Sequence, residues 1–162
     1  MTISPQVRAD IAAKVDALAT FDDAVAMCLI CVDRLKGASA AISDGAFCPG
    51  LSTALASRFG NVMDYAVKTA GWIVASADAI NVTDEARERT KTVVLQTYDC
   101  ISDTAEANDG CGFGDLLLEF VKSMGVVVQA AGKAVEPVGI GIGAILLGLA
   151  ALVIVLKWSP ST

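Results

Sequence analysis

The sequence contains no histidine. Histidine is the commonest general base and the commonest metal ligand, so its absence removes Ser-His and Cys-His nucleophile pairs. Basic residues are also few, with 12 Lys and Arg against 18 Asp and Glu and a net charge of −6. An acidic chain repels the phosphate backbone, which argues against a nucleic-acid partner. We therefore expect a non-catalytic protein with no bound metal and no cofactor.

Helical periodicity dominates residues 1–133. Apolar residues recur every three or four positions, and neither a β-hairpin pattern nor sustained strand alternation interrupts them. Helix starts are indicated at Ser4, Thr20, Ser52 or Thr53, Thr83 and Asp115. Gly37 is a candidate end for the second helix, although the alanines after it can continue the helix. The apolar positions in 55–80 approach heptad spacing, which is typical of an antiparallel bundle. The sequence predicts an all-α, acidic bundle of four to five helices.

Residues 138–156 form a 19-residue run without a charge, VGIGIGAILLGLAALVIVL. At about 1.5 Å per residue, a helix of this length spans about 28 Å, close to a hydrocarbon core of about 30 Å. Lys157 and Trp158 follow at once, and both residue types favour a membrane interface. A buried core helix is the alternative, but a helix that is apolar all round would need a far larger domain around it. The sequence predicts a linker at 134–137, a single transmembrane helix at 138–156 and a short tail at 157–162.

Small residues follow one face of this predicted span. The members of this face are Gly141, Ala144, Gly148 and Ala151. Small side chains let helices approach closely in lipid, although they are also common in membrane helices generally. We expect the span to contact membrane lipid and to pack against other transmembrane helices, either of a complex or of a homo-oligomer.

The chain has five cysteines: Cys28, Cys31, Cys48, Cys100 and Cys111. An odd number leaves at least one of them unpaired within the chain. Cys28 and Cys31 form a CxxC pattern inside an apolar helix, and no second close pair accompanies them. This setting favours buried thiols over a zinc, iron–sulfur or redox site. Cys48, Cys100 and Cys111 lie in loops or near a helix end, where disulfides would form in an oxidising lumen.

No secretory signal is recognisable at the N-terminus, because residues 1–6 lack basic side chains and no apolar segment follows. The sequence thus predicts a tail-anchored, single-pass protein whose domain stays in the cytosol or its equivalent. A lumenal or organellar protein whose targeting segment has been removed is the alternative. Lys122 and Lys133 before the span and Lys157 after it leave the positive-inside count undecided.

Together these features favour a non-catalytic structural or accessory subunit of a membrane protein complex. One alternative is a membrane-remodelling or permeabilising helical protein, because 66–80 carries only Lys68 and Asp78 as charged residues and could enter lipid. Another is an enzyme with a carboxylate-bound metal. The carboxylates available for that site are Asp22, Asp23, Asp99 and Asp103. The absence of a Glu-x-x-His element favours helix caps and a solvated face for them.

The plan of a helical domain followed by a C-terminal span resembles that of the tail-anchored apoptosis regulators, which implies the permeabilising alternative. Their death motif has a Leu before a Gly-Asp pair. In 55–61 the spacing differs by one residue, and Asn61 replaces the acid. Gly71-Trp72 inverts the Trp-Gly order of a second signature. The resemblance is architectural and assigns no family. Small single-span accessory subunits of respiratory, ATP-synthesising or photosynthetic complexes share this plan, as do minor viral membrane proteins.

Overall fold

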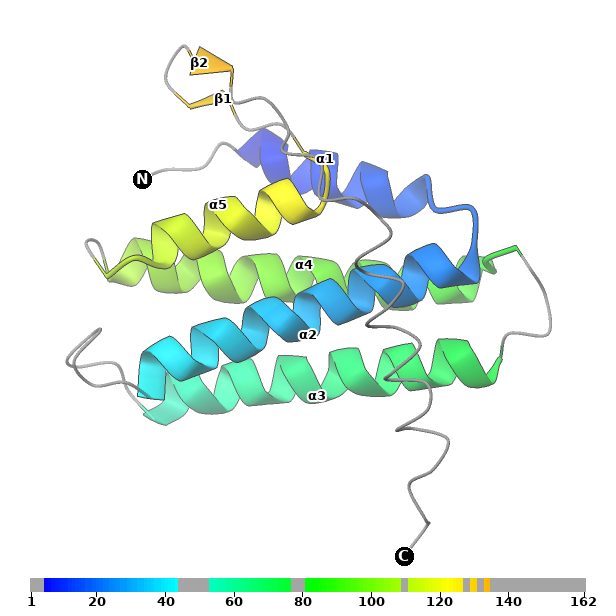
Figure 1. Ribbon diagram of the computed structural model, residues 1–162, viewed down its shortest axis with the longest axis horizontal. Helices are drawn as coiled ribbons and strands as arrows, with labels where there is room; N and C mark the ends of the chain where they lie inside the picture. Colours follow the sequence, from blue (N-terminus) through cyan, green and yellow to red (C-terminus); the bar gives the residue numbers. More distant parts are fainter. Residues whose placement is uncertain are drawn as a thin grey trace, which may run out of the picture.

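The structure is a computed structural model that describes residues 5–43, 53–76, 81–108, 111–126, 129–130 and 133–134. It contains five helices, α1 (Pro5–Asp16), α2 (Phe21–Ser43), α3 (Thr53–Ala75), α4 (Asp84–Ala107) and α5 (Phe113–Ser123). Helices α2, α3 and α4 pack against one another, α5 lies on α2 and α4, and α1 lies on α4 (Figure 1). The predicted all-α bundle is confirmed for the described residues.

Gly37 does not end the second helix, because α2 continues to Ser43. A glycine inside a helix costs roughly 1 kcal/mol relative to alanine. Leu35 and Ala38, on either side of Gly37, are fully buried. Burial of these side chains offsets the cost of the glycine, and the following alanines favour helix.

Helix α5 begins at Phe113, two residues before the predicted start at Asp115. Its N-cap is Gly112, whose φ of 71° is left-handed and carries no Cβ penalty in glycine. Phe113 is fully buried, so the helix starts where this ring enters the core. The left-handed glycine lets the chain turn into the helix without a side-chain cap.

A small antiparallel pair follows α5, formed by β1 (Gln129–Ala130) and β2 (Lys133–Ala134). The prediction of no hairpin is wrong for these four residues. Two-residue strands are too short to show a period-two pattern in the sequence.

The core consists of the apolar faces of all five helices. Its largest fully buried side chains include Phe59, Phe113, Phe120, Ile11, Leu35, Ile73, Ile101 and Leu117. On α3, the predicted inward positions are confirmed from Phe59 to Ile73, with Val62, Ala66 and Ala70 buried between them. Helical spacing alone therefore located the inward face of α3.

The start of α4 is fixed by a cap and by a backbone contact. Thr83 is the N-cap, as predicted, and its side-chain oxygen accepts a hydrogen bond from the Ala86 amide at 3.2 Å. Next to it, the Val82 amide donates to the Ala19 carbonyl at 3.1 Å. The beginning of α4 is thereby joined to the turn between α1 and α2.

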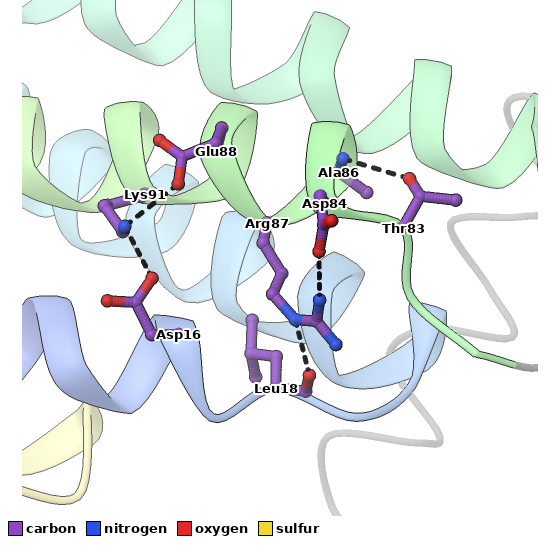
Figure 2. A network of polar contacts seen from close by, with 8 residues as sticks. All are labelled: Asp16, Leu18, Thr83, Asp84, Ala86, Arg87, Glu88 and Lys91. Atoms are coloured by element: carbon purple, nitrogen blue, oxygen red, sulfur yellow. Dashed lines mark hydrogen bonds and ion pairs between the residues drawn. The ribbon is translucent and has the colours of Figure 1, made fainter.

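Two basic residues of α4 strengthen this junction (Figure 2). Arg87 donates from Nε to the Leu18 carbonyl at 3.0 Å, and its guanidinium pairs with Asp84 at 2.7 Å. One turn further along, Lys91 forms an ion pair with Asp16 at the end of α1. The α1–α2 turn is held by side chains as well as by backbone.

No helix in the described ranges is both long enough and apolar enough to cross a membrane. The predicted span at 138–156 and the tail at 157–162 lie outside those ranges. The small-residue face of the span and the membrane anchor therefore stay predictions.

Candidate functional site

A cavity of about 520 Å³ lies between α3 and α4. Its lining residues are Ser57, Arg58, Asn61, Val62, Gln96, Asp99 and Cys100. The charged groups of this wall are already paired. Arg58 binds Asp103 at 2.8 Å, and Asp99 accepts two hydrogen bonds from Arg8 at 2.9 and 3.0 Å. An ionic ligand would have to compete with these pairs, so the cavity is weakly equipped to bind one.

The pKa directions agree with this pairing. The hydrogen bond from Arg58 to Asp103 raises the pKa of Arg58, and the bond to Asp99 raises that of Arg8. Both guanidinium groups therefore stay charged and committed to their carboxylates. They connect α3 and α1 to the second half of α4, which makes them structural contacts between helices.

In the described ranges, three cysteines are free, buried thiols: Cys28, Cys31 and Cys100. Burial raises the pKa of Cys28 to about 11, and it raises the pKa values of Cys31 and Cys100 as well. A neutral thiol is a poor nucleophile and a poor metal ligand. The CxxC pair therefore has the chemistry of core residues.

The neighbours of the CxxC pair are threonines of α4. Thr90, Thr97 and Thr104 are buried at seven-residue intervals. The Cys28 Sγ lies 4.0 Å from the Thr90 hydroxyl. Thr97 and Thr104 donate to carbonyls of their own helix at 2.8 and 2.7 Å, which satisfies their buried hydroxyls. This contact between α2 and α4 is a packed seam of small side chains.

Cys111, just before α5, is disulfide-bonded. Cys48, the other cysteine of a predicted loop, lies outside the described residues. A disulfide in this domain would persist in an oxidising compartment and be reduced in the cytosol. The redox state of Cys111 therefore reports on the redox environment of the domain.

The four carboxylates considered for a metal site do not gather. Asp22 and Asp23 occupy the first turn of α2, where Thr20 donates to Asp23 at 2.7 Å. Asp99 and Asp103 lie in the second half of α4 and pair with arginines. In the part of the chain that the structure describes, no three His, Cys, Asp or Glu side chains are placed to share a metal.

The exposed apolar feature of the domain lies on α3. Val67 and Val74, with 40% and 36% of their surface exposed, are the exposed large hydrophobic residues of the described ranges. Both belong to a row of uncharged residues along the helix, which we call the α3 stripe. Its members are Ala56, Gly60, Met63, Val67, Gly71 and Val74. A Cβ added at either glycine would meet no atom within 4 Å, so the stripe has open space above it.

The α3 stripe is turned away from α4. Arg58 pairs with Asp103 of α4, and Trp72 lies 4.0 Å beneath the Arg89 guanidinium of α4. At 100° per residue, these two positions lie about 140–180° around the helix from Val67. The sequence pattern did not identify the stripe, because it marked only one apolar face of this helix as inward.

The chain was compared with protein-family models, curated proteins and solved structures, and none of these comparisons gives a match. A functional conclusion therefore has to come from the chemistry of this chain.

Proposed function

We propose that this protein is a non-catalytic structural or accessory subunit of a membrane protein complex, anchored by one C-terminal span. The observation that carries the proposal is the 19-residue uncharged run at 138–156. A helix over that run matches the thickness of a bilayer core, and it is flanked by Lys157 and Trp158. Such a segment is costly to expose to water and is stable in lipid.

The small face of this run provides a contact with other spans. Gly141, Ala144, Gly148 and Ala151 recur at three- and four-residue steps. In lipid, where apolar surface alone gives no drive for association, close packing over small residues is a main source of helix affinity. We assign this face to neighbouring transmembrane helices.

The domain supports a binding role rather than a catalytic one. Its cavity between α3 and α4 is lined by charges that are already paired, and Cys28, Cys31 and Cys100 are neutral thiols. Among the described residues, the exposed large apolar side chains are Val67 and Val74 of the α3 stripe. We assign these two side chains to a protein–protein contact.

The redox state of Cys111 distinguishes two placements of the domain. The tail-anchored placement leaves it in the cytosol, whereas the disulfide at Cys111 favours an oxidising space. Mass spectrometry of unreduced protein, alkylated at once in freshly isolated membranes, separates them. A blocked thiol at Cys111 supports the cytosolic placement, and an intact disulfide supports the oxidising one.

Native gel electrophoresis tests the proposed function. The full chain, extracted from its own membrane with a mild detergent, is expected to migrate in a complex larger than a monomer. Carbonate washing should leave it in the membrane pellet. A chain that is released by carbonate, or that migrates as a monomer, would contradict the proposal. Dye release from liposomes by the purified chain would instead indicate the permeabilising alternative.

A further inference from the structure

We propose that the α3 stripe docks a second copy of this chain, with the two α3 helices antiparallel about a two-fold axis. The inference rests on the proposed role as a subunit of an assembly, and it names the partner of the helical domain. The stripe combines the exposed Val67 and Val74 with open space above Gly60 and Gly71. These are the two features that a second helix needs, an apolar surface and room for close approach.

The order of residues in the stripe is self-complementary when it is read in opposite directions. In an antiparallel two-fold pair, residues whose numbers have a constant sum lie level with each other. A centre at the level of Tyr65 makes this sum 130, which places large residues against small or medium ones. The level pairs are Ala56 with Val74 and Met63 with Val67, whereas Gly60 and Gly71, whose numbers sum to 131, lie about 1.5 Å from level.

Charge supports the same register. Asp64 and Lys68 lie beside the stripe, on its solvent side, and form an ion pair within α3 at 2.6 Å. In an antiparallel two-fold pair, equivalent flanks of the two helices face the same way. Asp64 of one copy then lies within about 3 Å, measured along the axis, of the level of Lys68 of the second copy. Four alternating charges would border the contact, which favours this pairing over other registers.

A parallel pair lacks this complementarity. Its two-fold axis runs along the helices, so the flank with Asp64 and Lys68 would face the opposite flank of the partner. That opposite flank carries Phe59 and Ala66, which are buried against the rest of the domain. The ion pairs between copies would therefore be absent from a parallel pair.

The proposed contact is small, so its affinity is low. The stripe contributes six residues per copy, whereas a stable interface usually has about 20–30 residues a side. We expect a weak dimer that depends on a high local concentration. Anchoring in a membrane would supply that concentration.

Site-directed cross-linking in the full chain tests the geometry. Val67→Cys places two thiols about 6 Å apart along the axis, whereas Val74→Cys places them roughly 27 Å apart. With a short bismaleimide, Val67→Cys is expected to give a covalent dimer and Val74→Cys alone is not. A mixture of Ala56→Cys and Val74→Cys chains should cross-link. Glu106→Cys, exposed on α4, and the unsubstituted chain set the background.

A charge exchange tests the register independently. Asp64→Lys should lower the cross-linked fraction of Val67→Cys by about fivefold, because lysines would then face lysines. Adding Lys68→Asp should restore it. Equal fractions in all three chains would contradict the proposed charge pairing. Far-UV circular dichroism checks that each variant keeps its helices.

Different experimental results would contradict this inference and the proposed function. Strong self-linking of Val74→Cys would indicate a parallel pair and overturn the antiparallel contact. Linking of Val67→Cys to a different protein would overturn self-docking and leave the subunit role standing. Absence of any linking above the Glu106→Cys background would remove the α3 contact. If the chain also migrates as a monomer on native gels, the subunit role fails as well.

Discussion

Arg87 offers a direct test of how the start of α4 is held. Its Nε donates to the Leu18 carbonyl at 3.0 Å, and its side chain is 28% exposed. A hydrogen bond to a charged group contributes about 1.5–3 kcal/mol when buried. Partial exposure reduces this, so we expect Arg87→Met to lower the unfolding free energy by about 1–2 kcal/mol. Methionine keeps much of the apolar stem and removes the guanidinium.

The matched control is Asp84→Asn. Asp84 is 98% exposed, so its ion pair with Arg87 contributes little, and the bond to Leu18 survives in this variant. Urea unfolding of the full chain in mild detergent, followed by far-UV circular dichroism, measures both changes. We expect Asp84→Asn to stay within about 0.5 kcal/mol of the unsubstituted chain. Equal costs for the two variants would refute the view that the bond to the α1–α2 turn is the stabilising contact.

Three further outcomes are expected. Phe59→Ala should lower the unfolding free energy by about 3–5 kcal/mol in the same assay, because it leaves a cavity at a fully buried ring. Burial raises the pKa of Cys28 from 9.0 to about 11. The contribution of this neutral thiol to the unfolding free energy is therefore complete below pH 9.0 and is lost as the pH rises toward 11. Over that range the stability of Cys28→Ala should fall less steeply than that of the unsubstituted chain, by up to about 1.4 kcal/mol per pH unit. Gly148→Leu should weaken co-purification of partners more than Leu149→Ala, by about 1–2 kcal/mol, because only Gly148 belongs to the predicted small face of the span. Equal co-purification would argue against a specific face.

The helices of this domain could be predicted where local chemistry decides them. Phe59, Val62 and Ile73 follow a helical period that is independent of the rest of the fold, and Thr83 caps its own helix. Gly37 shows the limit of this approach. Its local preference is to end a helix, but the buried residues around it override that preference, and burial depends on the other helices.

The candidate sites were less predictable, since they depend on contacts between distant segments. Arg8 and Asp99 are 91 residues apart in sequence, and no local pattern pairs them. The sequence favoured a helix cap or a solvated face for Asp99, with a metal ligand as the alternative, whereas the structure gives it a guanidinium partner. Val67 was missed for a related reason. The helical period marked the face of α3 that α2 and α4 cover, but it did not mark the adjacent face, where Val67 and Val74 stay exposed.

The two proposed contacts, one on α3 and one on the span, would strengthen each other. Each is modest alone: a stripe of six residues on one helix and a face of four small residues on another. If the proposed spans of two copies associate, the attached domains would be held near each other at an effective concentration on the order of millimolar. A weak α3 contact then becomes occupied without needing a large apolar surface. A larger exposed patch would make the domain prone to aggregate. Two exposed valines flanked by Asp64 and Lys68 therefore suit a weak contact that forms at the high local concentration that associated spans would provide.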